Sequence, residues 1–299
     1  MGESEGNAER TCFVRPRSQA TIPSLRRLFT PWRQVADTLI AVHSPLALRS
    51  PRLSAAGFRH AFFTRLGGFS LPPFHSLNFA SHVGDDPASV ARNLSIAAED
   101  LNVDAQRILF LKQVHGIVTH LAAPPLSLDE TEKWQGDALI AREPSIACGV
   151  RIADCAPILM ADPVSGFVAA IHSGWRGTEQ NITGHVIDTL RDHGCHAHHL
   201  IAAVGPHIER CCFETGHDVA ARLSRASPVH DVLHLGPRGR PHVDLRRILH
   251  AQLLQAGVRP NQIDHVRGCT VCDSERFFSY RRDGSRSGRL LAAIVPRKT

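Results

Sequence analysis

Three short segments hold the residues that are best suited to chemistry. They are Gln113-Val114-His115-Gly116, Ala153-Asp154-Cys155-Ala156-Pro157 and His172-Ser173-Gly174-Trp175-Arg176-Gly177. Each segment places a His or a Cys at the predicted end of a strand, beside turn residues. Imidazole and thiolate groups are ligands of zinc and related metals, and a thiol next to a His base can act as a nucleophile. The residue types therefore predict a metal site or nucleophilic catalysis.

Sequence spacing does not decide between these two chemistries. His115, Cys155 and His172 lie too far apart in the chain for any zinc-finger pattern. A metal site made from them requires a fold that brings the three segments together.

The elements that position these segments follow from apolar runs separated by turn signals. Strands are expected over 60–64, 108–113, 117–121, 137–141, 146–152, 157–161, 167–172, 200–204 and 290–295. The clearest helix is expected over 86–101, where Asp86 can cap the first turn and the following Pro suits the first helical position. Further helices are expected between Gly177 and Gly194 and over 245–255. This mixture predicts an α+β fold with mixed β-sheets.

Composition excludes several classes of protein. The 299 residues are 43% hydrophobic, enough for a packed core, and the longest apolar runs are far too short to cross a bilayer. The formal net charge of +6 has no Lys-rich block behind it, so we predict neither nucleic acid nor a membrane as a partner. Eight dispersed cysteines and no apolar signal-peptide core predict a cytoplasmic location.

The N-terminal region differs from the rest of the chain. Residues 10–33 are rich in Arg and contain no acidic residue, as transit peptides do, but Glu3, Glu5 and Glu9 precede them. We predict a poorly ordered extension over residues 1–55 and a single domain over residues 56–299.

Several longer motifs then resemble one family over most of this domain. They are Phe63-Thr64-Arg65-Leu66-Gly67-Gly68-Phe69-Ser70, Ser76-Leu77-Asn78-Phe79, His82-Val83-Gly84-Asp85-Asp86-Pro87, Phe278-Ser279-Tyr280-Arg281-Arg282 and the three segments above. In this order they resemble the laccase-domain purine nucleoside phosphorylase family, formerly called the multicopper polyphenol oxidase family. The resemblance implies a compact layered α/β sandwich.

The resemblance also implies an activity and a metal. It implies phosphorolysis of adenosine, inosine, guanosine and methylthioadenosine, together with adenosine deamination, which are transferase and hydrolase reactions. It implies one Zn²⁺ per chain held by His115, Cys155 and His172, with Cu²⁺ as a substitute, and it makes these residues and Asp154 the catalytic candidates. Three protein ligands leave a fourth position open, as in catalytic zinc sites. Cys155 as an acyl-transfer nucleophile is the competing interpretation.

Three other residues are candidates for roles around this site, and Asp154 has two alternative roles in it. Arg65 and Arg282 can bind a phosphate through their guanidinium groups, although a structural salt bridge explains each almost as well. Asn78 can bind ribose or base, or it can cap a turn. Asp154 can orient a metal ligand or carry a proton, and orientation is the preferred role.

Other cysteines and one loop are harder to interpret. Cys269-Thr270-Val271-Cys272 is one CxxC motif without a second pair, so packed thiols are favoured over a second zinc or a redox site, and Cys211-Cys212 is expected to be structural. His207 and Glu209 depart from the pattern of the family, and His207 could alter substrate preference or join the metal. Trp175 is expected in the core rather than as a platform for a base.

Two other function classes remain. A copper-dependent polyphenol oxidase needs ligands for several copper ions, and three ligands cannot supply them. A role in peptidoglycan quality control, suggested for bacterial relatives, would make the chain a partner-binding protein. Neither the preferred nucleoside nor the oligomeric state follows from the sequence.

Overall fold

The computed structural model describes residues 46–298, so most of the predicted extension lies outside the described residues. The described elements begin before residue 56. Strand β1 (Ala47–Leu48) pairs antiparallel with β2 (His60–Phe63). Helix α1 (Pro51–Ala55) starts at Ser50, whose hydroxyl donates a hydrogen bond of 2.6 Å to Asp264. Residues 47–55 therefore pack as part of the domain.

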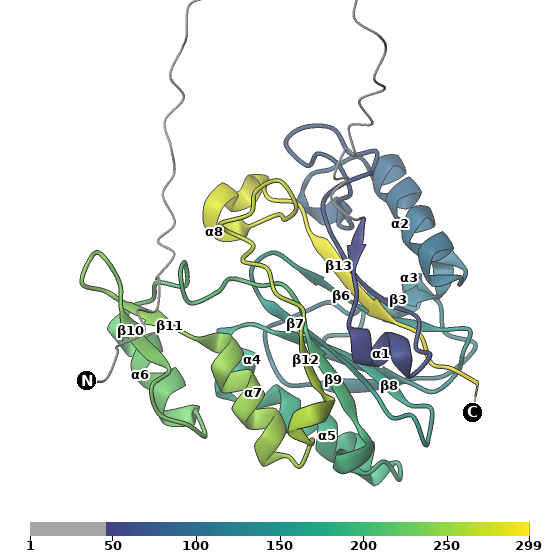
Figure 1. The fold of residues 1–299 in the computed structure, drawn as a ribbon. Coiled ribbons are helices and arrows are strands. Elements are labelled where there is room, and N and C mark those ends of the chain that lie inside the picture. Colours follow the sequence, from purple (N-terminus) through teal and green to yellow (C-terminus); the bar gives the residue numbers. More distant parts are fainter. Residues whose placement is uncertain (1–45, 299) are drawn as a thin grey trace, which may run out of the picture. The chain divides into compact units, whose positions relative to one another are not determined.

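Two mixed β-sheets form the centre of the domain (Figure 1). The five-stranded sheet has the order β1-β2-β13-β6-β3, and its other strands are β13 (Leu290–Ile294), β6 (Ala147–Ile152) and β3 (Ile108–Leu109). The six-stranded sheet has the order β12-β9-β7-β8-β5-β4, with β12 (Ile263–His265), β9 (Ile201–Val204), β7 (Ala156–Ala161), β8 (Val168–Ser173), β5 (Ala138–Ala141) and β4 (Thr119–Ala122). The pairs β3·β6, β12·β9 and β4·β5 are parallel and all other pairs in these two sheets are antiparallel.

The side chains of the central strands are apolar on both faces of each sheet. One apolar face of each sheet packs against the other sheet. Val150 and Ile294 of the five-stranded sheet share a buried cluster with Leu139, Leu159 and Ala170 of the six-stranded sheet. The neighbouring residues along each strand point outward and need helices to cover them.

Helices cover both outer faces and complete a layered α/β sandwich. Helix α2 (Pro87–Leu101) covers the five-stranded sheet, and Asp86 caps it by accepting the N–H groups of Ala88 and Ser89. Helices α5 (Ile182–Asp192) and α7 (Leu245–Gln255) cover the six-stranded sheet. The short helix α4 (Trp175–Glu179) follows β8 directly.

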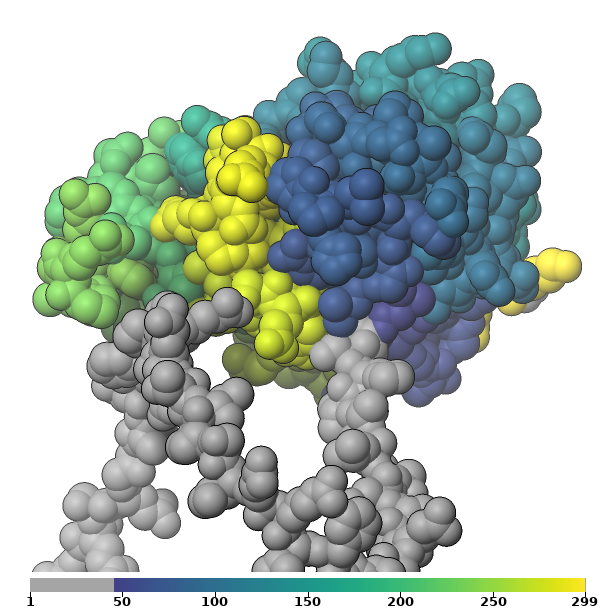
Figure 2. All heavy atoms as spheres, turned by 90° about the horizontal axis from the view of Figure 1, so that it is seen from above, coloured from purple at the N-terminus to yellow at the C-terminus, as the bar shows by residue number. Residues whose placement is uncertain are grey.

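A smaller satellite cluster packs beside α7. Helix α6 (His217–Ala226) contributes Ala220 and Leu223 to it, and strand β11 (Pro241–Val243), which pairs with β10 (Leu233–Leu235), contributes Val243. Two short helices complete the list: α3 (Leu128–Thr131) and α8 (Tyr280–Asp283). In Figure 2 the C-terminal part of the chain, in yellow, lies between the green part that contains α6 and the blue part that contains α2.

These observations confirm the predicted α+β class with mixed sheets. The helices predicted over 86–101 and 245–255 are present, and the helix predicted after Gly177 is divided into α4 and α5. The strand predicted over 108–113 is only Ile108–Leu109, because the chain then turns into the segment that carries His115. Within residues 46–298, no helix has the length and apolarity that a membrane span requires.

Candidate active site

The three predicted ligands lie together where the ends of β7 and β8 meet the turn after β3. His172 lies near the end of β8 and is opposite Pro157 of β7, and Cys155 directly precedes β7. His115 enters from the 113–116 segment with a positive φ of 61°, which turns the backbone sharply. Antiparallel pairing of β7 and β8 therefore brings Cys155 and His172 side by side despite their separation in the sequence.

Their ligand atoms converge on one point. One ring nitrogen from each His and the Cys155 sulfur all lie within 4.8 Å of one another. The two imidazoles meet edge to face, with ring centroids 4.9 Å apart. His172 is buried, Cys155 is half-buried and His115 is exposed, so the cluster opens to solvent on the side of His115.

Asp137 holds this cluster in place, and the sequence analysis did not identify it. Its carboxylate lies 2.8 Å from His172 Nδ1 and accepts the backbone N–H groups of Val114, His115 and Gly116. One buried carboxylate thus fixes both His-bearing segments and leaves His172 Nε2 available for a metal. One feature of the sequence could have indicated it: an acidic residue directly before a fully buried strand, β5.

The electrostatics of the cluster favour an ionised thiol. Burial opposes the Cys155 thiolate, but the charge of His172 and hydrogen bonds from His115 and His172 outweigh it and lower the pKa of Cys155 to about 6. Burial also opposes the His172 imidazolium, but the Cys155 thiolate and Asp137 raise the pKa of His172 to about 9. Without a cation the pair is therefore a thiolate and an imidazolium, and a divalent metal would take the place of the imidazolium proton.

The cluster borders a cavity of about 820 Å³, large enough for a nucleoside and an anion. Its wall is partly apolar and carries several cationic side chains. The lining residues other than the three ligands are Ser81, His82, Leu111, Lys112, Gln113, Glu132, Arg151, Ala153, Asp154, Gly174, Trp175, Ile208, Phe213, Leu245, Tyr280, Arg281 and Arg289.

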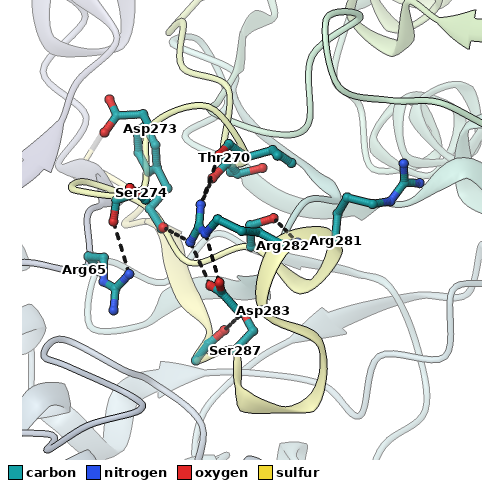
Figure 3. Close-up of polar contacts among 12 residues, drawn as sticks. Arg65, Thr270, Asp273, Ser274, Arg281, Arg282, Asp283 and Ser287 are labelled. Carbon is teal, nitrogen blue, oxygen red and sulfur yellow. Dashed lines mark hydrogen bonds and ion pairs between the residues drawn. The ribbon is translucent and has the colours of Figure 1, made fainter. Parts of the chain in front are cut away.

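The two arginines predicted to bind phosphate do not line this cavity. The guanidinium of Arg282 donates to the carbonyls of Thr270, Val271 and Phe277 and pairs with Asp283 at 2.7 Å. Figure 3 shows this guanidinium between Thr270 and Asp283. Its donors bind the protein itself, which agrees with the structural alternative.

Arg65 and Asn78 are engaged in the same way. Arg65 donates to the carbonyl of Ser274 (Figure 3). It also donates to the carbonyl of His75 and stacks on Phe278. Burial and the neighbouring Arg282 lower the pKa of Arg65. Asn78 is fully buried. Its amide nitrogen donates to the Ala80 carbonyl and the Asp85 carboxylate, and its amide oxygen accepts the N–H groups of Ala80 and Arg289. Both side chains hold loops together behind the cavity wall.

Asp154 lines the cavity, but its carboxylate faces a neighbouring loop. It accepts the Thr270 hydroxyl and the Arg281 N–H, each at 2.6 Å. The carboxylate in contact with a ligand ring is that of Asp137, not Asp154. Asp154 therefore fixes the backbone next to Cys155.

His207 is fully buried and is not part of the candidate ligand cluster. Its Nδ1 lies 2.8 Å from the Gly205 carbonyl, and burial together with Arg246 lowers the pKa of His207 to about 3. Glu209 pairs with Arg246 at 2.7 Å. Both departures from the family pattern therefore belong to one buried structural network.

Trp175 differs from its predicted place in the core. It is only partly buried and lines the cavity, while it also packs against the satellite cluster. Arg176 and Arg222 lie over its ring, 4.4 and 5.0 Å from the centroid.

The ligand atoms of this cluster are nitrogen and sulfur, and they limit which metal ion fits. Two imidazoles and one thiolate suit zinc, and a single mixed His and Cys group occurs among residues 46–298. A multicopper centre needs more His ligands than this group provides. The three residues fit one ion of the zinc type.

Comparison with known proteins agrees with this architecture. A family model described as multi-copper polyphenol oxidoreductase laccase matches residues 59–297. The chain is 38% identical to a purine nucleoside phosphorylase of Deinococcus radiodurans over 84% of this chain and 93% of that protein. It is 35% identical to adenosine deaminase RL5, from an unknown prokaryotic organism, over 74% of this chain and 87% of that protein.

Solved structures show the same fold. The crystal structure of YlmD from Geobacillus stearothermophilus superposes with a TM-score of 0.77 at 32% identity, over 83% of this chain and 94% of that one. The Bacillus licheniformis protein YfiH gives a TM-score of 0.75 at 30% identity, over 80% of this chain and 92% of that one. The family model matches most of this chain, and the relatives are similar to it over most of their own length. The chain therefore belongs to the laccase-domain family that includes proteins named purine nucleoside phosphorylase.

Proposed function

We propose that the protein is a zinc-dependent purine nucleoside phosphorylase that also deaminates adenosine, and that it acts in the cytoplasm. The observation that carries the proposal is the convergence of His115, Cys155 and His172 at the edge of a cationic cavity. The names of its relatives, purine nucleoside phosphorylase and adenosine deaminase, support an enzyme of this class.

His115, Cys155 and His172 would hold the metal. A zinc ion there would supply Lewis-acid chemistry for an oxygen nucleophile, because three protein ligands would leave one position for it. Asp137 keeps the His172 ring oriented by its 2.8 Å contact with Nδ1. Orthophosphate for phosphorolysis and water for deamination are both oxygen nucleophiles, which explains why one site can serve both reactions.

Arg289 is the best placed anchor for phosphate in the cavity wall. Its backbone N–H is held by Asn78, and one side-chain nitrogen donates to the carbonyls of Ser287 and Gly288. Among residues 46–298 it forms no ion pair, whereas Arg151 is paired with Glu132 at 2.6 Å. Arg289 lines the same cavity as Cys155, and burial lowers the pKa of its guanidinium against the opposing charge of Cys155. A guanidinium binds phosphate through two parallel hydrogen bonds.

The apolar part of the wall suits a purine base. Trp175, Phe213 and Tyr280 line the cavity, and flat aromatic surfaces stack with bases. Arg281 stands between Phe213 and Asp154 and donates to the carbonyls of Cys212 and Glu214, so its position is fixed. Arg289 lies over the Tyr280 ring, 5.8 Å from its centroid. We infer that the base lies on the side of Trp175 and Phe213 and the phosphate on the side of Arg289 and Tyr280.

The test compares the wild type with Cys155→Ser and with Cys195→Ala, a matched change of a buried cysteine outside the site. Bound metal is quantified, and adenosine and inosine are incubated with and without phosphate. We expect base and ribose 1-phosphate to form only with phosphate, and inosine to form from adenosine without it.

Both activities and bound metal should be lost in Cys155→Ser and kept in Cys195→Ala. Base release that is indifferent to phosphate would overturn phosphorolysis. Turnover that survives Cys155→Ser and metal removal would overturn the ligand assignment.

A further inference from the structure

A second group of metal-binding side chains lies outside the candidate active site. Cys211 and Cys212 meet Cys269 and Cys272, which are about 60 positions further along the chain. The sulfur of Cys211 lies 3.6 Å from that of Cys269 and 3.5 Å from that of Cys272, and Cys212 lies 3.3 Å from Cys272. All four sulfur atoms lie within 4.8 Å of one another. The second cysteine pair that the CxxC motif lacks in sequence is therefore supplied by the fold.

These distances match a tetrahedral thiolate site. With Zn–S bonds of about 2.3 Å, the sulfur atoms at the corners of a tetrahedron are about 3.8 Å apart. The separations of 3.3, 3.5 and 3.6 Å lie just below this value and no two of the four sulfur atoms are more than 4.8 Å apart, so small movements would place every sulfur at bonding distance from one central ion.

The backbone around Cys269 is held in place on both sides. Cys269 forms a β-bridge with His207, whose N–H donates to the Gly268 carbonyl and whose carbonyl accepts the Thr270 N–H. The Asp273 N–H donates to the Cys269 carbonyl and closes the CxxC turn.

The composition of the group selects the metal. It contains four sulfur ligands and neither imidazole nor carboxylate, and a complete set of four thiolates is typical of structural zinc. Hard cations such as Mg²⁺ and Ca²⁺ prefer oxygen ligands. We propose that Cys211, Cys212, Cys269 and Cys272 bind one Zn²⁺ in a closed tetrathiolate site.

The location of this site gives the ion a structural role. Thr270, inside the CxxC turn, donates to Asp154, and Arg281 connects Asp154 to the carbonyl of Cys212. The ion would therefore fasten the segment after β12 to the loop before α6, where the yellow and green parts of Figure 2 lie against each other. The loop before α6 contributes Ile208 and Phe213 to the wall of the cavity next to Cys155, and α8, which follows the other segment, contributes Tyr280 and Arg281.

This proposal does not depend on the reaction that the cavity performs, and metal counting tests it. The full chain is purified under reducing conditions and analysed for zinc beside three variants: Cys155→Ser, the double variant Cys269→Ser with Cys272→Ser, and Cys195→Ala. We expect about two zinc ions per wild-type chain. Cys155→Ser and the double variant should each lose one, and Cys195→Ala should lose none.

Cobalt gives a readout that does not require the cysteine group to be mutated. In Cys155→Ser the active site has no thiolate left, so cobalt–sulfur charge-transfer absorption of the cobalt-loaded protein reports the four-cysteine group alone. A strong band that grows to one equivalent and is displaced by Zn²⁺ is the expected result. No such band in the reduced, folded protein would overturn the proposal.

Thermal unfolding separates a structural ion from adventitious binding. Removal of the metal should lower Tm in Cys155→Ser, where only the tetrathiolate ion remains. It should leave Tm unchanged in a triple variant that combines Cys155→Ser with Cys269→Ser and Cys272→Ser and therefore lacks thiolates at both sites. An equal Tm of metal-free and metal-loaded Cys155→Ser would overturn the structural role. Recovery of the four cysteines as disulfides from protein kept under reducing conditions would overturn the metal site itself.

Discussion

The carboxylate of Asp137 lies 2.8 Å from Nδ1 of His172 and is fully shielded from solvent. It also accepts three backbone N–H groups from the segment that carries His115. These hydrogen bonds and His172 lower the pKa of Asp137, although burial alone would raise it. A single carboxylate thus sets the distance between two of the three candidate ligands.

Asp137→Asn should weaken metal binding while the chain still folds. The amide cannot accept from the ring and from three N–H groups as a carboxylate does, so His172 loses its orientation. We expect a loss of about 10- to 100-fold in metal affinity, measured by competition with a chromogenic chelator, and a parallel loss of turnover. Asp129→Asn, a change of an exposed residue in α3, is the control. Unchanged affinity in Asp137→Asn would contradict the orienting role.

Gly174→Ala should crowd the same cluster. A Cβ at this position would lie 3.0 Å from the Cys155 sulfur and 3.1 Å from the His115 ring. Since φ is −74°, Ala suits the backbone, and the effect is confined to the ligands. We expect lower metal occupancy and turnover with little change in Tm. Gly177→Ala is the matched control because its nearest atoms are at 3.5 Å or beyond; equal occupancy in the two variants would refute the crowding argument.

Arg289→Ala should raise the KM for phosphate and spare deamination. The loss of a charged hydrogen-bonding partner costs about 1.5–3 kcal/mol, which corresponds to a rise of about 10- to 100-fold. Initial rates of inosine phosphorolysis at varied phosphate measure it.

Arg65→Ala provides the contrast for Arg289→Ala. Its guanidinium donates to two backbone carbonyls, so its removal should lower the free energy of unfolding by about 1–3 kcal/mol. The KM for phosphate should not change. A selective effect of Arg65→Ala on this KM would restore Arg65 as a phosphate ligand.

Acid should destabilise the protein in part through His60. The Ser50 N–H donates to Nε2 and Nδ1 donates to the Phe58 carbonyl, so the buried ring is neutral, and burial lowers the pKa of His60 below 6.5. The unfolded chain then binds the proton first. Stability is therefore complete above about pH 6.5 and falls below it, by up to about 1.4 kcal/mol per pH unit.

Denaturant unfolding between about pH 5 and pH 8 measures this contribution. His60→Gln keeps an amide donor and acceptor but removes the titration, so its stability should depend less on pH than that of the wild type. His196→Gln, at an exposed position, is the control. Identical slopes for the wild type and His60→Gln would show that His60 does not contribute.

Local pattern by itself determined much of the secondary structure. Asp86 followed by a proline predicts the start of α2 because a side-chain cap and a fixed φ act within one turn. Apolar periodicity predicts α7 and the buried strands because the repeat of a helix or a strand is set by neighbouring residues. The motifs also named His115, Cys155 and His172, which the fold does bring together.

Only the tertiary structure decided what these residues contact. Asp137 reaches His172 through the pairing of β5 with β8, and Cys211 meets Cys272 through loops about 60 positions apart in sequence. Arg65, Asn78 and Arg282 were candidate substrate ligands in sequence, yet backbone groups of the protein itself take up their hydrogen bonds: the Ser274 carbonyl, the Arg289 N–H and the Thr270 carbonyl. Hydrogen bonding depends on separation in space, and the sequence pattern records only separation along the chain.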